Sequence, residues 1–135
     1  MEFKNEWVTT KIDSDTVKWA SEFGSMLAKN KADNSGREMR DSKLTTSQLR
    51  KFFGEVKRQQ ALGFNSTDFI LLKPKLAYAV GRTKKPDSRM HDFYKVMSKA
   101  IDQVKDEKQF KNFIKLFEAI VAYHKAAEES KLEIN

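Results

Sequence analysis

The sequence predicts an all-α fold, a compact bundle of about five helices. Apolar residues recur at helical rather than alternating spacing almost throughout, and only two prolines and five glycines interrupt the pattern. A chain of 135 residues is long enough to bury a core of its own. We therefore expect residues 1–135 to form a single helical domain.

The first helix is expected from about residue 14 to residue 29, because Ser14 and Asp15 are good N-cap residues. One of its faces would be buried, formed by Val17, Ala20, Phe23 and Leu27. Residues 30–43 are rich in Asp, Asn, Ser and Gly and contain no large apolar side chain except Met39. This composition predicts a flexible linker ahead of a core segment at residues 44–127, which carries the motifs of the chain.

The second helix is expected to begin at Thr45 or Thr46, either of which can cap it. Gly63 is a natural place for it to end. Its buried stripe follows the i, i+3, i+4, i+7 pattern and consists of Leu49, Phe52, Phe53 and Val56.

A third helical region is expected from Ser66 or Thr67 to about Gly81. Pro74 must either kink this helix or begin a new one, because proline lacks the backbone N–H and crowds the preceding turn. Residues 83–88 follow as a polar, basic loop.

The fourth helix is expected from Asp87 or Ser88 to Val104, burying Met90, Phe93, Met97, Ala100 and Ile101. Asp106 can cap the last and longest helix, which we expect to fray after Ala127. The apolar stripe of this helix is the most hydrophobic in the chain and predicts the centre of the core: Phe110, Phe113, Ile114, Phe117, Ile120, Val121 and either Tyr123 or His124.

Positive charge is concentrated in the middle of the chain. The whole sequence has 26 Lys or Arg and 19 Asp or Glu, a net charge of +7. Residues 43–89 contain 11 of these cations against 3 acidic residues, whereas the segments on either side are close to neutral. A segregated excess of this kind is typical of a surface that binds a polyanion, and nucleic acid is the leading candidate.

Four candidate contact residues lie on the second expected helix. Arg50 and Lys57 share one edge of it, and Lys51 and Arg58 share the next. Gly54 lies between them, although a glycine inside a helix costs about 1 kcal/mol relative to alanine. Either a sugar-phosphate backbone approaches closely there or another helix packs against it.

Three further candidates, Lys73, Lys75 and Arg82, lie in the third helical region. A single exposed cation is usually only solvated, but helices that pack through their apolar sides can bring their cations onto one surface. Contact with phosphates needs charge and reach, so such binding would be largely indifferent to sequence. Tyr78 could stack on a base, but we expect it to pack inside the bundle.

Catalysis is not expected, and no catalytic residue, metal site or cofactor is predicted. The chain has no cysteine and only two histidines. His91 and Asp92 are neighbours that point in different directions on a helix, and His124 is expected at the surface near a helix end. The sequence also has no apolar segment long enough to cross a membrane and no apolar leader, so we expect a cytoplasmic protein.

Three segments resemble a known family. They are LTTSQLRKFF at residues 44–53, LKPKLAYAVGR at residues 72–82 and FEAIVAYHK at residues 117–125. Together they are similar to the small subunit (Csm2 family) of the type III-A CRISPR-Cas Csm effector complex. The resemblance covers most of the chain but does not extend to residues 1–43.

The resemblance implies a helical, non-catalytic subunit that associates with copies of itself and with the backbone and large subunits of the complex, in antiviral defence. It also implies contact with target RNA and with the duplex of target and CRISPR RNA (crRNA). Carried over by motif, RNA contact would fall on Arg50, Lys51, Lys73, Lys75 and Arg82, with Lys57 and Arg58 added from helical spacing. Two alternatives stay open: a stand-alone helical nucleic-acid-binding protein, and an oligomeric adaptor that binds only proteins.

Overall fold

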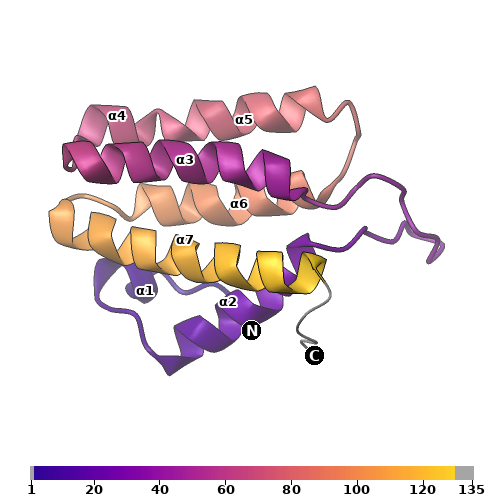
Figure 1. The fold of residues 1–135 in the computed structure, drawn as a ribbon, viewed down its shortest axis with the longest axis horizontal. Coiled ribbons are helices and arrows are strands. Elements are labelled where there is room, and N and C mark those ends of the chain that lie inside the picture. Colours follow the sequence, from indigo (N-terminus) through magenta and orange to yellow (C-terminus); the bar gives the residue numbers. More distant parts are fainter. Residues whose placement is uncertain (1, 130–135) are drawn as a thin grey trace.

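The computed structural model describes residues 2–129 and confirms the all-α bundle (Figure 1). Its helices are α1 Glu6–Thr9, α2 Ser14–Leu27, α3 Thr46–Leu62, α4 Ser66–Ile70, α5 Leu72–Arg82, α6 Arg89–Asp102 and α7 Glu107–Glu128. Within the described residues, five of these helices have eleven residues or more and no β-sheet forms. The fraying expected after Ala127 falls largely outside the residues that the structure describes.

The helices begin where short polar side chains can cap them. The Thr45 hydroxyl accepts the Gln48 N–H at 3.1 Å, and an Asp106 carboxylate oxygen accepts the Gln109 N–H at 2.9 Å. For α2 the cap is Asp13, one residue before the expected Ser14 or Asp15. The helix starts were therefore predictable to within about one residue from capping chemistry alone.

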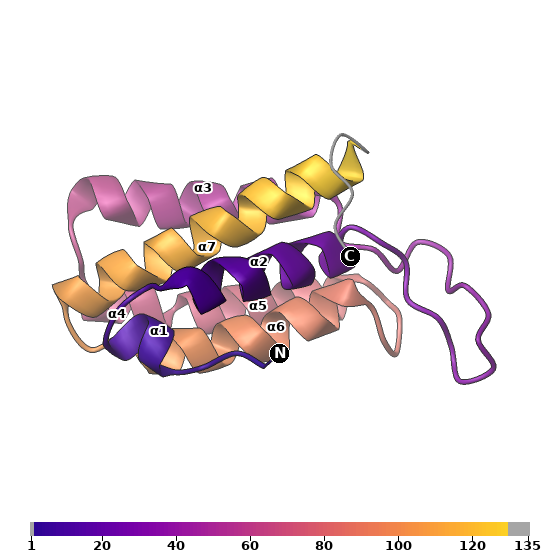
Figure 2. The ribbon, with the colours of Figure 1, turned by 90° about the horizontal axis from the view of Figure 1, so that it is seen from below.

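α7 lies at the centre of the fold, as its hydrophobic stripe predicted, and α2 runs alongside it (Figure 2). The two backbones approach closely at Gly24, where an added Cβ atom would lie 2.7 Å from the Ile120 carbonyl oxygen. Phe113 and Phe117 on α7 are fully buried. Gly24 is thus required for packing, because any larger residue would push α2 off α7.

The N-terminal segment adds a short helix that the sequence did not predict. α1 buries Trp7 and Val8 against α7, and the Asn112 side chain donates a hydrogen bond to the Val8 carbonyl at 2.9 Å. The expected face of α2 is also rotated, since Val17 is exposed and Trp19 is buried. A row of aromatic rings explains the rotation, because Trp19 packs between Trp7 and Phe23, with ring centroids 5.5 and 4.8 Å away.

The third expected helix is divided in two at Leu71, which ends α4 and precedes α5. Pro74 is the third residue of α5, within the first turn, where backbone N–H groups have no helical partner to lose. Pro74 therefore belongs to a new helix, one of the two outcomes expected from the sequence. α5 ends at Arg82, one residue beyond the expected stop at Gly81.

Residues 30–43 form an extended turn that projects from the bundle (Figure 1). The Met39 N–H donates to the Lys31 carbonyl at 2.7 Å, and a bridge joins Ala32 to Glu38. The Lys31 ammonium lies 2.8 Å from Asp87 and 3.1 Å from Asp92. These contacts tie the turn to the start of α6, and the flexibility expected for residues 30–43 stays a prediction.

Candidate nucleic-acid interface

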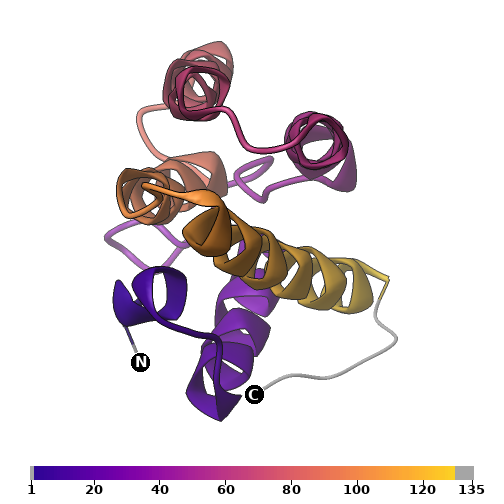
Figure 3. The same ribbon diagram turned by 90° about the vertical axis from the view of Figure 1, so that its left-hand side faces the viewer.

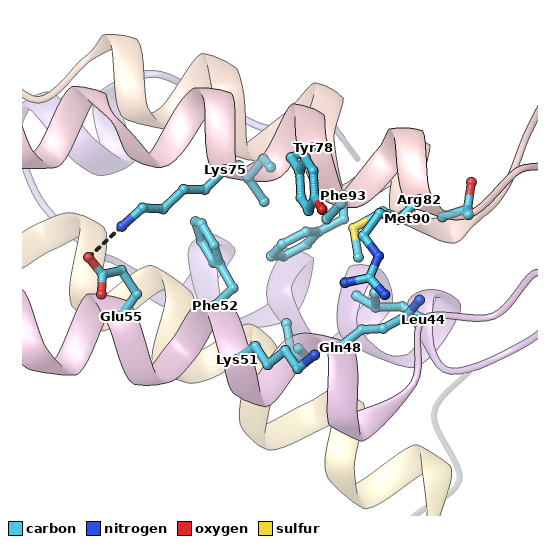
Figure 4. A pocket seen from close by; sticks show the side chains of 14 residues that line it. Leu44, Gln48, Lys51, Phe52, Glu55, Lys75, Tyr78, Arg82, Met90 and Phe93 are labelled. Carbon is cyan, nitrogen blue, oxygen red and sulfur yellow. Dashed lines mark hydrogen bonds and ion pairs between the residues drawn. The ribbon is translucent and has the colours of Figure 1, made fainter.

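A groove of about 420 Å³ lies between α3 and α5. α3 packs mainly on α7, and α5 packs mainly on α6, so α3 and α5 lie apart when the bundle is viewed end-on (Figure 3). Figure 4 shows the side chains that line this opening, which we call the α3–α5 groove. Its floor is apolar and includes Leu44, Leu49, Phe52, Leu76, Met90 and Phe93, and its rim includes Gln48, Lys51, Glu55, Lys75, Tyr78, Arg82 and Thr83.

The α3–α5 groove collects three of the seven predicted contact residues. Lys51 reaches it from α3, and Lys75 and Arg82 reach it from α5 (Figure 4). Lys75 and Arg82 are seven residues apart and therefore lie two helical turns apart on the same side of α5. The floor of the groove includes apolar side chains of α3 and α5 together with Met90 and Phe93 of α6, so the packing of α3 and α5 on the bundle brings the cations together.

Lys51 and Arg82 have no carboxylate partner among residues 2–129, and the same holds for Arg50. All three side chains are exposed to solvent. An exposed cation that is not neutralised by a neighbour keeps its full charge available to an incoming anion. Lys51 and Arg82 therefore give the rim of the groove positive charge that can attract an anion.

Glu55 occupies the opposite end of the groove and is neutralised by two cations. One carboxylate oxygen of Glu55 lies 2.8 Å from Arg58 and 2.8 Å from Lys75. Hydrogen bonds from Arg58 first and Lys75 second lower the pKa of the Glu55 carboxyl to about 2, despite its partial burial. Glu55 is thus ionised at neutral pH, and its charge is offset by its own partners.

Two of the other predicted contact residues pair with acidic side chains outside the groove. Lys57 lies on the α7 side of α3, 3.0 Å from Glu118. Lys73 lies 2.7 Å from Asp102 on α6. The structure therefore does not bring Lys57 or Lys73 into the α3–α5 groove.

Two features of this region differ from the more conservative expectation. Among residues 2–129, an added Cβ atom at Gly54 would have no neighbour within 4 Å, so no helix of this part of the chain packs against the glycine and the packing explanation is wrong. Tyr78 is 69% exposed rather than packed, and the Arg82 guanidinium carbon lies 5.9 Å from the centre of its ring. The spacing of Tyr78 and Arg82 by four residues is the sequence signal that could have revealed this pair.

Both histidines of the chain make hydrogen bonds within the fold. His124 is buried rather than at the surface, and its Nε2 lies 2.6 Å from the Leu44 carbonyl oxygen. His91 Nδ1 lies 2.8 Å from the Ser88 hydroxyl, which caps the same helix. No group of three or more acidic or histidine side chains in this range could hold a metal ion, and none of its helices combines the length and apolarity needed to cross a bilayer.

The fold and the α3–α5 groove define a small all-helical protein with a basic groove on its surface. A family model described as Csm2 Type III-A matches residues 25–130, which is most of the chain. The chain belongs to this family, so it is a small subunit of the type III-A Csm complex and associates with other subunits of that complex. No curated protein and no solved structure matched the chain significantly.

Proposed function

We propose that this small subunit is non-catalytic and contacts target RNA, paired with the crRNA guide, through sugar-phosphate groups at the α3–α5 groove. The observation that carries the proposal is the position of Lys51 and Arg82. They come from two different helices, reach the same groove, and have no acidic partner in the described chain.

Contact with phosphates fits the role of a subunit in an RNA-guided complex. Base pairing between guide and target supplies sequence specificity, so the protein needs only to recognise backbone and shape. Lysine and arginine side chains at the mouth of the groove supply charge without a fixed geometry for reading bases. The exposed backbone at Gly54 offers a place where a sugar-phosphate chain can approach α3 closely.

The seven proposed contact residues divide into two groups. Arg50, Lys51 and Arg82 are available directly, because none of them has an acidic partner among residues 2–129. The remaining four, Lys57, Arg58, Lys73 and Lys75, would exchange an acidic partner for a phosphate. Exposed ion pairs are worth only about 0–1 kcal/mol, so this exchange costs little.

Self-association along the complex is the second part of the proposal. Leu62, Ile70 and Leu71 are exposed apolar side chains near the junction of α3 and α4, and Leu62 is 71% exposed. Burial of such side chains between copies would favour assembly. Light scattering of the purified chain over a concentration series tests this part, and Leu62→Asp should shift any oligomer toward the monomer. The cytoplasmic location expected from the sequence stays a prediction.

The RNA contact is tested with the reconstituted complex that carries Lys51→Glu and Arg82→Glu together. The matched control is Lys111→Glu with Lys115→Glu, which changes the net charge equally at exposed positions on α7. We expect the groove variant to weaken binding of all target sequences alike and to lower the slope of log K against log salt by about two. Unchanged affinity and slope in the groove variant, or an equal loss in the control, would contradict the proposal.

A further inference from the structure

We propose that the α3–α5 groove binds one unpaired nucleotide of RNA, with its base against the Tyr78 ring and its phosphate beside Lys51 and Arg82. This inference rests on the proposed function and specifies what the groove recognises. Phosphate contact alone requires only exposed cations. The α3–α5 groove also presents an exposed aromatic ring, an apolar floor and a polarised rim.

Tyr78 is the first of these features. It is 69% exposed although it lies on a helix with buried neighbours, and its only ring contact in the described chain is the Arg82 guanidinium. Leaving so large an apolar ring in water forgoes favourable burial. An exposed aromatic ring beside a cation is the arrangement with which proteins stack single-stranded bases.

The floor and size of the groove suit a base. Leu76 and Phe93 line the groove and are buried. Phe52 contributes a partly buried ring from α3 (Figure 4). The volume of about 420 Å³ falls within the range of about 300–1,000 Å³ typical of small-molecule pockets. The floor would cover the face or edge of a base that a duplex normally buries by stacking.

The rim of the groove is polarised along its length. In Figure 4, Glu55 and Lys75 lie at one end, Arg82 and Gln48 lie at the other, and Tyr78 lies between them. The Glu55 carboxylate is paired with Arg58 and Lys75, whereas Lys51 and Arg82 carry unpaired positive charge that attracts an anion. A nucleotide suits this groove, because its flat apolar base can lie on the floor while its anionic phosphate meets Lys51 and Arg82.

Gln48 adds a hydrogen-bonding group beside the base position. Its Oε1 atom accepts the Thr45 N–H at 2.9 Å as part of the helix cap, which fixes the orientation of the amide. The amide NH₂ has no hydrogen-bond partner in the part of the chain that the structure describes. It is therefore free to donate to a base carbonyl or a ribose hydroxyl.

An unpaired nucleotide fits better than a paired base or a protein side chain. Inside a duplex both faces of a base are covered by its neighbours, so only an extruded or single-stranded base can reach Tyr78. An apolar side chain from another protein would have to desolvate Lys51, Lys75 and Arg82 without supplying a counter-charge. The phosphate group of a nucleotide supplies that counter-charge.

The test uses the reconstituted complex with its guide and targets that carry one unpaired 2-aminopurine, placed in turn at successive positions. Stacking quenches 2-aminopurine fluorescence, so at one or more positions we expect quenching in the wild type and in Tyr78→Phe. Tyr78→Ala should restore the fluorescence and weaken binding of those targets by about 5- to 150-fold relative to the fully paired target. Val17→Ala, which alters an exposed apolar residue on α2 outside the groove, is the control.

The outcomes separate this inference from the proposed function. If Lys51→Glu with Arg82→Glu weakens all targets while Tyr78→Ala changes neither fluorescence nor affinity, phosphate contact stands and the nucleotide pocket is wrong. If Tyr78→Ala weakens paired and unpaired targets equally, the pocket is also wrong. If Tyr78→Ala instead prevents the complex from assembling, as seen by size-exclusion chromatography, the groove holds a protein side chain and the inference is overturned.

Discussion

The His124 imidazole on α7 binds the Leu44 carbonyl at 2.6 Å, in a site where both residues are almost fully buried. The carbonyl can only accept, so His124 Nε2 carries the proton and donates it. Leu44 also donates its own N–H to the Leu27 carbonyl at the end of α2. Leu44, which lies just before α3, is therefore hydrogen-bonded to both the end of α2 and α7.

His124→Leu should destabilise the protein by about 1–3 kcal/mol, because it leaves the buried Leu44 carbonyl without a hydrogen bond. Urea unfolding followed by circular dichroism measures the change. Lys125→Ala, at the next and exposed position, should alter the free energy of unfolding by no more than about 0.5 kcal/mol. Equal stability of His124→Leu and the wild type would show that the hydrogen bond contributes nothing.

Two glycine substitutions should have opposite effects on stability. Gly24→Ala places a methyl group 2.7 Å from the Ile120 carbonyl oxygen and should cost about 1–3 kcal/mol through overpacking. Gly54→Ala meets open space inside a helix and should stabilise the protein by about 0.5–1 kcal/mol. Thermal unfolding of both variants provides the comparison, and a stabilised Gly24→Ala would disprove the close packing of α2 on α7.

Glu55 should give the protein a stability that is lost in acid. Its pKa is about 2 in the folded state against 4.5 for an ordinary glutamate, so the contribution is complete above about pH 4.5 and disappears as the pH falls towards 2. At pH 7 Glu55→Gln should cost about 1–2 kcal/mol, less than the full shift implies, because Arg58 and Lys75 are half-exposed and solvent screens them.

Urea unfolding of the wild type and Glu55→Gln at a series of pH values checks this prediction, and the two curves should converge between pH 4.5 and 2. Glu118→Gln serves as the control, since its pair with Lys57 is more exposed. A difference between wild type and Glu55→Gln that does not change with pH would contradict the ionic origin of the effect.

The same Glu55→Gln change should strengthen RNA binding. It releases Arg58 and Lys75 from their carboxylate and raises the net charge of the groove by one. We expect a higher affinity at low salt and a steeper dependence on salt, because more counterions are displaced from the RNA. Titration of the complex with target RNA at several salt concentrations measures both, and weaker binding would indicate that Glu55 itself contacts the RNA.

Lys31 should restrain residues 30–43. Lys31→Met removes the ammonium group that pairs with both Asp87 and Asp92, so the turn loses its ion pairs to the start of α6. We expect trypsin to cleave this variant faster after Arg37 and Arg40. Lys29→Met removes a neighbouring lysine without touching the network, and should leave the cleavage rate unchanged. Equal rates in both variants would show that these ion pairs do not hold the turn.

Much of the fold was predictable because each helix carries its own signals. Short polar caps and periodic apolar stripes are local, so Thr45, Asp106 and the stripe of α7 could be identified directly from the sequence. The sequence did not predict α1 because a helix of four residues is too short to show a periodic apolar pattern. Trp7 and Val8 are core residues because they pack against α7, which their local sequence does not reveal. The burial of Trp7 and Val8 depends on tertiary packing, which the local sequence pattern does not show.

The candidate site was predictable in part. The charge excess in residues 43–89 pointed to the right helices, and Lys51, Lys75 and Arg82 do line one groove. The acidic partners of Lys57 and Lys73 lie 61 and 29 residues away along the chain, so only the packed structure could identify them. Exposure of Tyr78 likewise depends on the gap between α3 and α5, which has no signature in either helix alone.

The position of Leu44 has a consequence for truncated forms of the protein. The three segments that resemble the family begin at residue 44, yet a chain cut there would lose α1 and α2, which cover α7, and would leave the Leu44 N–H without the Leu27 carbonyl. The apolar surface of α7 around Ile120 would be exposed to solvent. We therefore expect that the segments resembling the family do not fold without residues 1–43, which cover the apolar surface of α7.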